Sequence, residues 1–228
     1  MRTTLFAGCL LGGLALTGVA RAQGTPVAMT PDTSAYAGKE AGGIMVRLRA
    51  IGVIPLDSGS SVSGIGGSVH ASASAAPELD VSYFFTDNIA AELIAASTQH
   101  NVWVSGSALG HVNVGNVWVL PPTVTLQYHF MPHERFSPYV GAGLNLTFFY
   151  ATQGSYPVSK FNLGTNVGAA LQAGFDYNVT GRWFLNFDVK QIFLSTSGDV
   201  HVPPLHATLH AKTDLNPLVI GAGIGYRF

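Results

Sequence analysis

The sequence is poor in charge and has no apolar segment after its first residues that could form a membrane helix. Charged residues make up 10% of its 228 residues, whereas an average soluble domain has roughly 25%. After Val19 no apolar run reaches the roughly 20 residues that a spanning helix requires. Few charges without such a run favour β-strands that lie in a membrane.

Cysteine is also nearly missing, because Cys9 is the one cysteine and it falls in the apolar run near the amino terminus. A mature chain without this run has no disulfide, no thiolate nucleophile and no cysteine-ligated metal site. Loss of Arg2 and Arg21 with it changes the formal net charge from −1 to −3, with 9 basic against 12 acidic residues. That balance excludes an electrostatic surface for nucleic acid. We expect no nucleic-acid partner and no cofactor.

Residues 1–22 have the pattern of a secretory signal peptide. Arg2 precedes an apolar run from Leu5 to Val19, and Ala20-Arg21-Ala22 matches the small-x-small pattern before signal-peptidase cleavage. Lipoprotein cleavage before Cys9 is the alternative, but it would leave most of the apolar run on the wrong side of the cysteine.

The rest of the chain divides into a short lead-in and one domain. Residues 23–40 contain Pro26 and Pro31 and no periodicity, so we predict a mobile periplasmic segment. Residues 41–228 are enough for one transmembrane β-barrel domain and few for two domains.

The end of the chain alternates without a break between the two faces of a strand. One face is apolar and consists of Leu218, Ile220, Ala222, Ile224, Tyr226 and Phe228. The other face carries Val219, Gly221, Gly223, Gly225 and Arg227. Glycine weakens a strand unless something needs the space. An apolar face against lipid and a small, partly charged face against a narrow lumen would explain both patterns.

Segments with this period occur eight times along the chain, and the connections between them alternate between long and short. The predicted strands are at about 41–54, 77–86, 88–101, 117–130, 137–152, 165–177, 182–197 and 213–228. The predicted long loops are 55–76, 102–116, 153–164 and 198–212, and the short turns are 86–88, 131–136 and 178–181. This layout is typical of an all-β, eight-stranded antiparallel barrel of the Gram-negative outer membrane, with short periplasmic turns and long extracellular loops.

Most of these strands are apolar on one face and polar on the other, which places the polar residues inside a barrel. The predicted lumen network comprises Arg47, Arg49, Glu78, Asp80, Glu92, Gln127, His129, Gln172, Asp176, Asp188, Lys190 and Arg227, together with Asn145 and Asn186. Such charges are tolerable only when they are paired and hydrogen-bonded. Because eight strands leave room for little more than side chains, a structural salt-bridge core is favoured over a polar conduction path or a proton-linked site.

Aromatic residues recur beside the short turns, where the periplasmic belt of a membrane barrel would lie. They are Tyr83, Phe85, Tyr128, Phe130, Phe136, Tyr139, Phe175, Tyr177, Trp183, Tyr226 and Phe228. Tyr226 and Phe228 also form the C-terminal end that we expect barrel-assembly machinery to recognise.

Pro121 and Pro122 interrupt one predicted strand and remove two donors from its ladder. The wall there must be bulged, unpaired on one side, or open. A bulge is the conservative interpretation. The alternative is a lateral opening through which an apolar molecule leaves the lumen for the lipid, with the freed backbone groups satisfied by protein or water.

Four stretches point to one family of barrels; the last of them is shared by many barrels, whereas the first two are far more specific. They are Leu120-Pro121-Pro122-Thr123, Phe136-Ser137-Pro138-Tyr139-Val140-Gly141-Ala142-Gly143, Thr86-Asp87-Asn88-Ile89 before Glu92-Leu93, and Gly225-Tyr226-Arg227-Phe228. Together they resemble the outer membrane protein W family over residues 41–228. The resemblance implies an eight-stranded barrel with periplasmic termini that passes small hydrophobic molecules across the outer membrane. It also implies an apolar pocket near the extracellular end with a lateral exit to the bilayer.

The long connections here are Gly/Ser-rich and contain histidine, which departs from the family, so the pocket residues must be chosen from chemistry. A pocket for apolar ligands needs large apolar side chains near the extracellular strand ends. The candidates are Ile54, Leu56, Val102, Trp103, Val104, Trp118, Phe148 and Phe149. We expect about half of them to face lipid instead. The expected partners are outer-membrane lipid and small apolar solutes, whose identity and direction of transport the sequence leaves open.

Other functional classes have weaker support. A structural or adhesive barrel with a plugged lumen and no transport role is the main alternative. An enzyme would need an acid/base constellation, for which the residues at hand are Asp57, Ser58, His100, Asp199 and His201. Their spacing is not specific. His206 and His210 are four apart, but the prolines at 203–204 do not favour a helix that would make them shared metal ligands. The glycines of 64–67 lack the strand-to-helix context of a phosphate site.

Overall fold

The computed structural model describes residues 38–56, 58–156, 158–203 and 207–228. The predicted signal peptide and most of the predicted lead-in lie outside the described residues. In this part of the chain, no helix is long and apolar enough to cross a bilayer.

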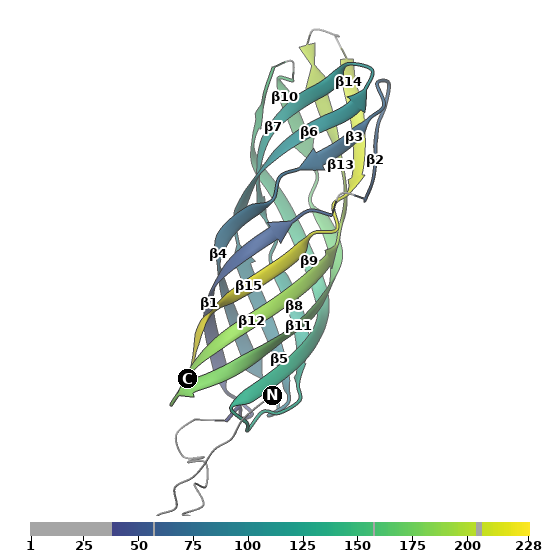
Figure 1. Cartoon of the computed structure of the whole chain (residues 1–228). Coiled ribbons are helices and arrows are strands. Elements are labelled where there is room, and N and C mark those ends of the chain that lie inside the picture. Colours follow the sequence, from purple (N-terminus) through teal and green to yellow (C-terminus); the bar gives the residue numbers. More distant parts are fainter. Residues whose placement is uncertain (1–37, 57, 157, 204–206) are drawn as a thin grey trace, which may run out of the picture. The chain divides into compact units, whose positions relative to one another are not determined.

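Eight strands close into an antiparallel barrel, which forms the lower part of the ribbon in Figure 1. In order around the wall they are β1 (Ile44–Ile54), β4 (Ser74–Phe84), β5 (Ile89–Ala96), β8 (Thr123–His129), β9 (Phe136–Gly154), β11 (Asn166–Thr180), β12 (Trp183–Phe193) and β15 (Leu218–Arg227). The last strand pairs with the first, for example at Gly223 and Arg49, so the wall has no free edge. The predicted eight-stranded antiparallel barrel is confirmed.

The long connections are themselves built largely of strands, which differs from the loops expected at 55–76, 102–116, 153–164 and 198–212. The additional strands are β2 (Ser58–Val62), β3 (Ser68–Ala71), β6 (Thr98–Ser107), β7 (Gly110–Leu120), β10 (Lys160–Leu163), β13 (Ser195–Val202) and β14 (Ala207–Asp214). They pair in the orders β3-β6-β7-β9 and β10-β13-β14-β2 and extend the barrel upward in Figure 1. Neighbouring hairpins supply the partners that make strands out of Gly- and Ser-rich sequence, because β propensity depends on context.

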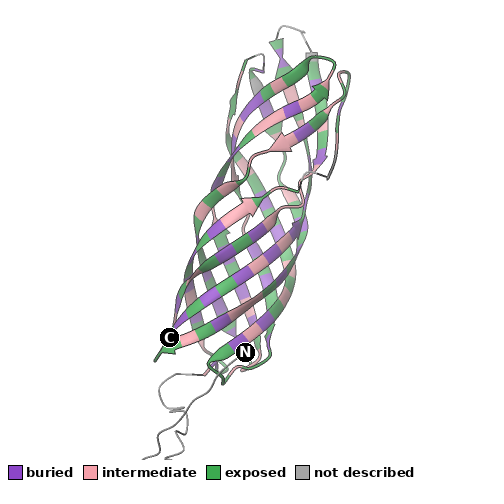
Figure 2. Cartoon of the chain, in the orientation of Figure 1, coloured by how far each residue is buried: buried purple, intermediate pink, exposed green. Residues whose placement is uncertain are grey.

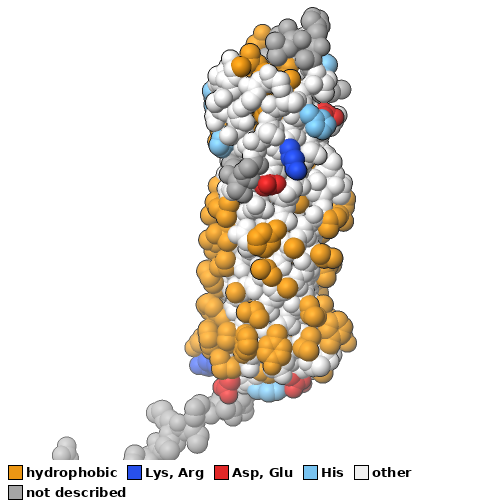
Figure 3. Space-filling model, turned by 90° about the vertical axis from the view of Figure 1, so that its right-hand side faces the viewer, with side chains coloured by type: hydrophobic (Ala, Val, Ile, Leu, Met, Phe, Trp, Pro, Cys, Tyr) orange, Lys and Arg blue, Asp and Glu red, His pale blue; other side chains and the backbone are white. Residues whose placement is uncertain are grey.

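Burial alternates along the barrel strands (Figure 2). In β8, Val124 and Leu126 are exposed, whereas Thr125 and Gln127 are buried. Figure 3 shows apolar side chains gathered around the lower barrel, with charged side chains just above and just below this apolar zone. An apolar outer face over a polar lumen is the arrangement of a barrel that spans a membrane.

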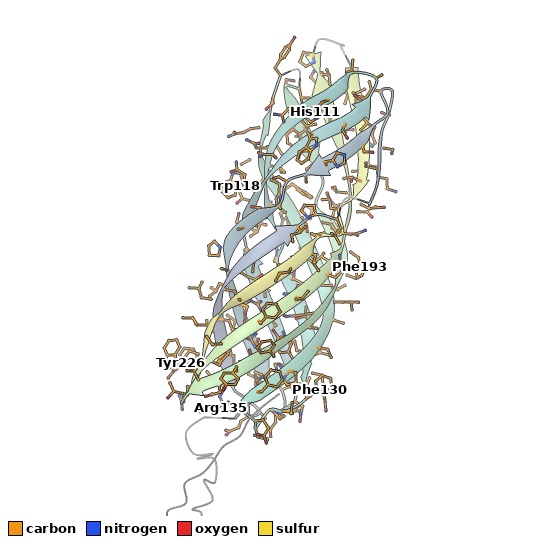
Figure 4. The ribbon with its side chains drawn as sticks, in the orientation of Figure 1. His111, Trp118, Phe130, Arg135, Phe193 and Tyr226 are labelled. Carbon is orange, nitrogen blue, oxygen red and sulfur yellow. The ribbon has the colours of Figure 1, made fainter. Side chains whose placement is uncertain are left out.

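Most of the aromatic residues predicted for a belt lie on the outer face near the lower end, where Figure 4 labels Phe130 and Tyr226. The Tyr226 ring packs on Trp183 and Phe228 at centroid distances of 5.0 and 4.9 Å. The predicted place of Tyr139 in the aromatic belt is wrong, because Tyr139 is buried in the lumen and does not face lipid. A Cβ at Gly174 would lie 2.6 Å from its hydroxyl oxygen, which explains why that strand position holds glycine.

Candidate ligand chamber and its polar floor

The lower lumen is filled by polar side chains that we call the polar plug. Its charged members are Lys39, Arg47, Arg49, Glu78, Asp80, Glu92, Asp176, Asp188 and Lys190, each at most 6% exposed. The register of β1 and β4 sets Arg47 directly opposite Asp80 and Arg49 directly opposite Glu78. The strand register alone therefore makes residues of opposite charge neighbours on the inward face.

Two guanidinium groups connect the carboxylates of several strands. Arg47 lies 2.8 Å from Asp80 and 3.2 Å from Asp176, measured between Nη and Oδ atoms. Arg49 Nη2 lies 2.6 Å from Glu78 Oε1 and 3.1 Å from Asp80 Oδ2. Buried charges require this kind of pairing, and the arginine geometry allows one side chain to satisfy several carboxylate oxygens.

Uncharged side chains complete the plug. Gln172 Nε2 donates hydrogen bonds to Glu92 Oε2 at 2.9 Å and to Asp188 Oδ2 at 2.7 Å. The Tyr139 hydroxyl donates to the same Asp188 oxygen at 2.9 Å. These shared hydrogen bonds hold the side chains of the plug in position, and the side chains fill the lower lumen.

Lys39 closes the lower end of the plug, and the sequence pattern did not single it out. Its Nζ lies 2.8 Å from Asp176 Oδ2, 2.7 Å from His129 Nδ1 and 2.7 Å from Ser137 Oγ. Burial lowers the pKa of Lys39 to about 8, although the Asp176 carboxylate opposes that shift. Arg227, which we predicted for the lumen network, is only half-buried and lines a small cavity of about 20 Å³ beside Lys39. The other predicted network residues are all buried.

Above the plug the lumen holds two adjoining apolar cavities of about 110 and 60 Å³, which we call the inner and outer cavities of one chamber. They share lining residues, among them Val69, Val102 and Leu163. The inner cavity is walled by aliphatic side chains such as Ile51 and Ile192. Glu78 and Lys190 also line it, so the top of the plug is the floor of the chamber.

The predicted pocket residues separate into two groups. Val102 and Phe149 line the inner cavity, and Val104 lines the outer one. The others, which lie outside both linings, are Ile54, Leu56, Trp103, Trp118 and Phe148. Adjacent strand residues point to opposite faces, so Phe148 faces outward because Phe149 faces inward. Ile54 and Leu56 are likewise exposed, Trp103 stacks on His70, and Trp118, labelled in Figure 4, packs near Tyr150.

The aliphatic lining from the barrel strands was not among the pocket candidates. Ile51, Val53, Ile192 and Val219 all face the inner cavity. The inward position of Ile51 and Ile192 was readable from the sequence, because Arg49 and Lys190 lie two residues before them on the same faces of β1 and β12.

Pro121 and Pro122 interrupt the wall without a bulge. Ile94 pairs with Thr123 and Thr98 pairs with Val119, and these two pairs keep one register across the prolines. The conservative interpretation of a bulge is therefore wrong.

The wall beside the prolines is paired on one side only. Among the described residues, no ladder pair joins 95–97 to 120–122. On the other side, the Pro122 carbonyl accepts a hydrogen bond from Leu146 N at 2.9 Å, and the Pro121 carbonyl accepts one from Asn145 Nδ2 at 3.2 Å. Proline has no N–H to donate toward β5, and Pro121 lines the inner cavity.

The residues considered for an enzyme or metal site do not form a common site. His100 is buried in the inner cavity, where its Nδ1 lies 2.6 Å from the Ser72 carbonyl oxygen. Asp199 lines the outer cavity and pairs with His210. Asp57 and His206 lie outside the described residues. Within the part that the structure describes, no group of three His, Cys, Asp or Glu side chains is placed to hold a metal ion.

The fold and the chamber define a small membrane barrel with a closed lower lumen and an apolar upper cavity. The OmpW family model matches residues 40–228, and the chain belongs to this family. It is similar to "Uncharacterized outer-membrane protein y4mB" of Sinorhizobium fredii, with 49% identity over 184 residues that cover 80% of this chain and 79% of that protein.

Two further matches agree with this assignment. Outer membrane protein W of Vibrio cholerae is 33% identical over 198 residues, covering 82% of this chain and 89% of that protein. The crystal structure of OprG from Pseudomonas aeruginosa has a TM-score of 0.77 and 28% identity, covering 84% of this chain and 98% of that one. The chain is a non-enzymatic barrel of the Gram-negative outer membrane.

Proposed function

We propose that this barrel binds small hydrophobic molecules in the chamber and passes them across the outer membrane by release through the barrel wall. The observation that carries the proposal is the position of an apolar chamber directly above a closed polar plug. Apolar cavities with few polar groups are the usual sites for small ligands.

The size of the chamber limits the solute. An engineered apolar cavity of about 150 Å³ binds benzene, and the inner cavity of about 110 Å³ continues into the outer one. A single ring or a chain of about six carbons is the size of molecule that this space favours.

The polar plug favours exit of the solute through the barrel wall. A solute in the inner cavity has Glu78 and Lys190 beneath it, and an apolar molecule gains nothing by entering a network of paired charges. The wall beside Pro121 lacks ladder hydrogen bonds toward β5, so separating the strands there breaks fewer bonds than elsewhere. This supports Pro121 and Pro122 as the lateral opening.

Uptake of a radiolabelled apolar solute such as toluene into lipid vesicles tests the proposal. Replacing Pro121 by Val and Pro122 by Thr should restore ladder donors and slow uptake while binding to the chamber is retained. Pro77→Val is the matched control, because Pro77 is an exposed strand proline with a ladder partner, Ala50. Equal uptake by wild type, the double variant and empty vesicles would contradict transport and leave the structural or adhesive barrel as the better account.

A further inference from the structure

The chamber is not lined by apolar groups alone. We infer that its ligand carries one uncharged oxygen acceptor, as in a ketone, an ester or an alcohol, and that this oxygen binds the Lys190 ammonium at the chamber floor. This inference rests on the proposed function, since it names the class of solute for the same chamber.

Lys190 has hydrogen-bond capacity that the protein does not use. Its Nζ lies 3.7 Å from Glu92 Oε2 and 3.6 Å from Asp188 Oδ1, which gives attraction between charges but exceeds hydrogen-bond length. Among the described residues Nζ has no hydrogen-bond partner, and the side chain is 1% exposed. An ammonium group has three donors, and the Lys190 side chain lines the inner cavity.

The other buried lysine shows what a satisfied ammonium looks like in this barrel. Lys39 Nζ has three polar atoms within 2.8 Å, from Asp176, His129 and Ser137. The plug can therefore satisfy a lysine completely. A buried donor without an acceptor is costly, so a ligand oxygen at Lys190 would recover an interaction that the empty chamber lacks.

The remaining polar groups of the chamber point to the same site. Glu78, the other charged residue at the floor, accepts a hydrogen bond of 2.7 Å from Arg49 Nε and forms an ion pair of 2.6 Å with Arg49 Nη2. Its charge is therefore already matched. Further out, the hydroxyl of Thr213 is also buried and without a partner among the described residues, and it lines both cavities. Lys190 and Thr213 are thus two residues of the chamber lining whose buried polar atoms have no hydrogen-bond partner among the described residues, and the charged one lies at the floor.

Charge balance selects an uncharged oxygen over a carboxylate. The plug holds five carboxylates and four cations, an excess of one negative charge; its members are Glu78, Asp80, Glu92, Asp176 and Asp188 against Lys39, Arg47, Arg49 and Lys190. A ligand carboxylate at Lys190 would add another buried negative charge close to Glu92 and Asp188. Burying a charge without a new counter-ion is unfavourable, whereas a neutral oxygen accepts a hydrogen bond without that cost.

A six-carbon ligand series on the wild-type barrel in lipid nanodiscs tests the inference. Hexane, 2-hexanone and hexanoate are titrated, binding is followed by methyl resonances of isoleucine and valine, and each affinity is corrected for partition into protein-free nanodiscs. We expect 2-hexanone to bind about tenfold more tightly than hexane, as one hydrogen bond to a charged donor provides. Hexanoate should bind less tightly than 2-hexanone.

Two lysine variants assign the effect to Lys190. Lys190→Met should remove the preference for 2-hexanone, so that hexane and 2-hexanone bind with equal corrected affinities. Lys39→Met removes the same charge from the plug at the far end from the chamber and should keep the preference.

The possible failures are separable. Equal corrected affinities of hexane and 2-hexanone for the wild type overturn the inference even if a variant does not fold, and tightest binding of hexanoate overturns the choice of an uncharged oxygen. If none of the three ligands binds, the proposed function fails as well.

Discussion

The Ser97 Oγ atom and the Tyr150 hydroxyl oxygen lie 2.5 Å apart, and this hydrogen bond reaches across β7 on the outside of the wall, next to the stretch that the two prolines leave unpaired. Ser97 follows β5 and Tyr150 belongs to β9. The bond therefore holds together strands that are joined by fewer backbone hydrogen bonds at this level.

Removal of this bond should make the wall easier to open. A net hydrogen bond contributes about 1 kcal/mol, so Tyr150→Phe should increase the rate of solute release from loaded vesicles by roughly fivefold. Tyr156→Phe, at a fully surface-exposed tyrosine, is the control and should leave the rate unchanged. Identical release from both variants would show that the bond does not hold the opening.

Loss of Arg47 should destabilise the barrel strongly. Arg47→Met leaves Asp80, Glu92 and Asp176 without their shared cation, and breaking a buried ion pair from one side costs about 3–5 kcal/mol. Urea unfolding in lipid vesicles measures the difference. Arg135→Met, at the rim labelled in Figure 4, should change the free energy of unfolding by no more than about 0.5 kcal/mol. Similar losses in the two variants would contradict a special role for the buried network.

The buried Lys39 should make the stability of the barrel depend on pH in the alkaline range. Burial lowers its pKa in the folded barrel from 10.5 to about 8, so between these values the unfolded chain binds more protons than the folded one. The free energy of unfolding should then rise as pH increases from 8 toward 10.5. Urea unfolding of wild type and Lys39→Met over this range measures the contribution, and the rise should be smaller in the variant. Parallel curves would exclude Lys39 as its source.

The C-terminal aromatic residue should matter for assembly more than for the chamber. Phe228 is exposed beside Tyr226 at the lower end of the barrel, far along β15 from the residues that line the cavity. Deletion of Phe228 should reduce the amount of barrel inserted in cells, whereas protein refolded into vesicles should bind solute normally. Phe130→Ala is a control at another exposed aromatic residue of the same end. Normal insertion of the deletion variant would exclude Phe228 as an assembly signal.

The barrel was predictable because one rule, alternation, acts on every strand. Val124 and Thr125 show it within two residues, and the same parity predicted that Arg47 and Asp80 face the lumen. The upper strands were not predictable in this way, since β3 and β14 contain many small or polar residues and depend on partners from other hairpins. Such long-range pairing leaves little trace in a local pattern.

The chamber was only partly predictable for a related reason. The choice between Phe148 and Phe149 depends on register near the end of a strand, where a shift of one residue exchanges the two faces. Lys39 was missed because it lies outside the periodic segments, and its role comes entirely from contacts with residues about ninety or more positions away. The sequence predicted that Lys190 faces the lumen, but it did not predict that Lys190 lies between the polar plug and the chamber.

The polar plug has an electrical consequence. Because Arg47, Asp80 and their neighbours fill the lower lumen, a solute that took the proposed route through the wall would carry no column of water or salt with it. The proposed delivery would thereby be separated from ionic current, so many copies of the barrel could work in one membrane without lowering its electrical resistance.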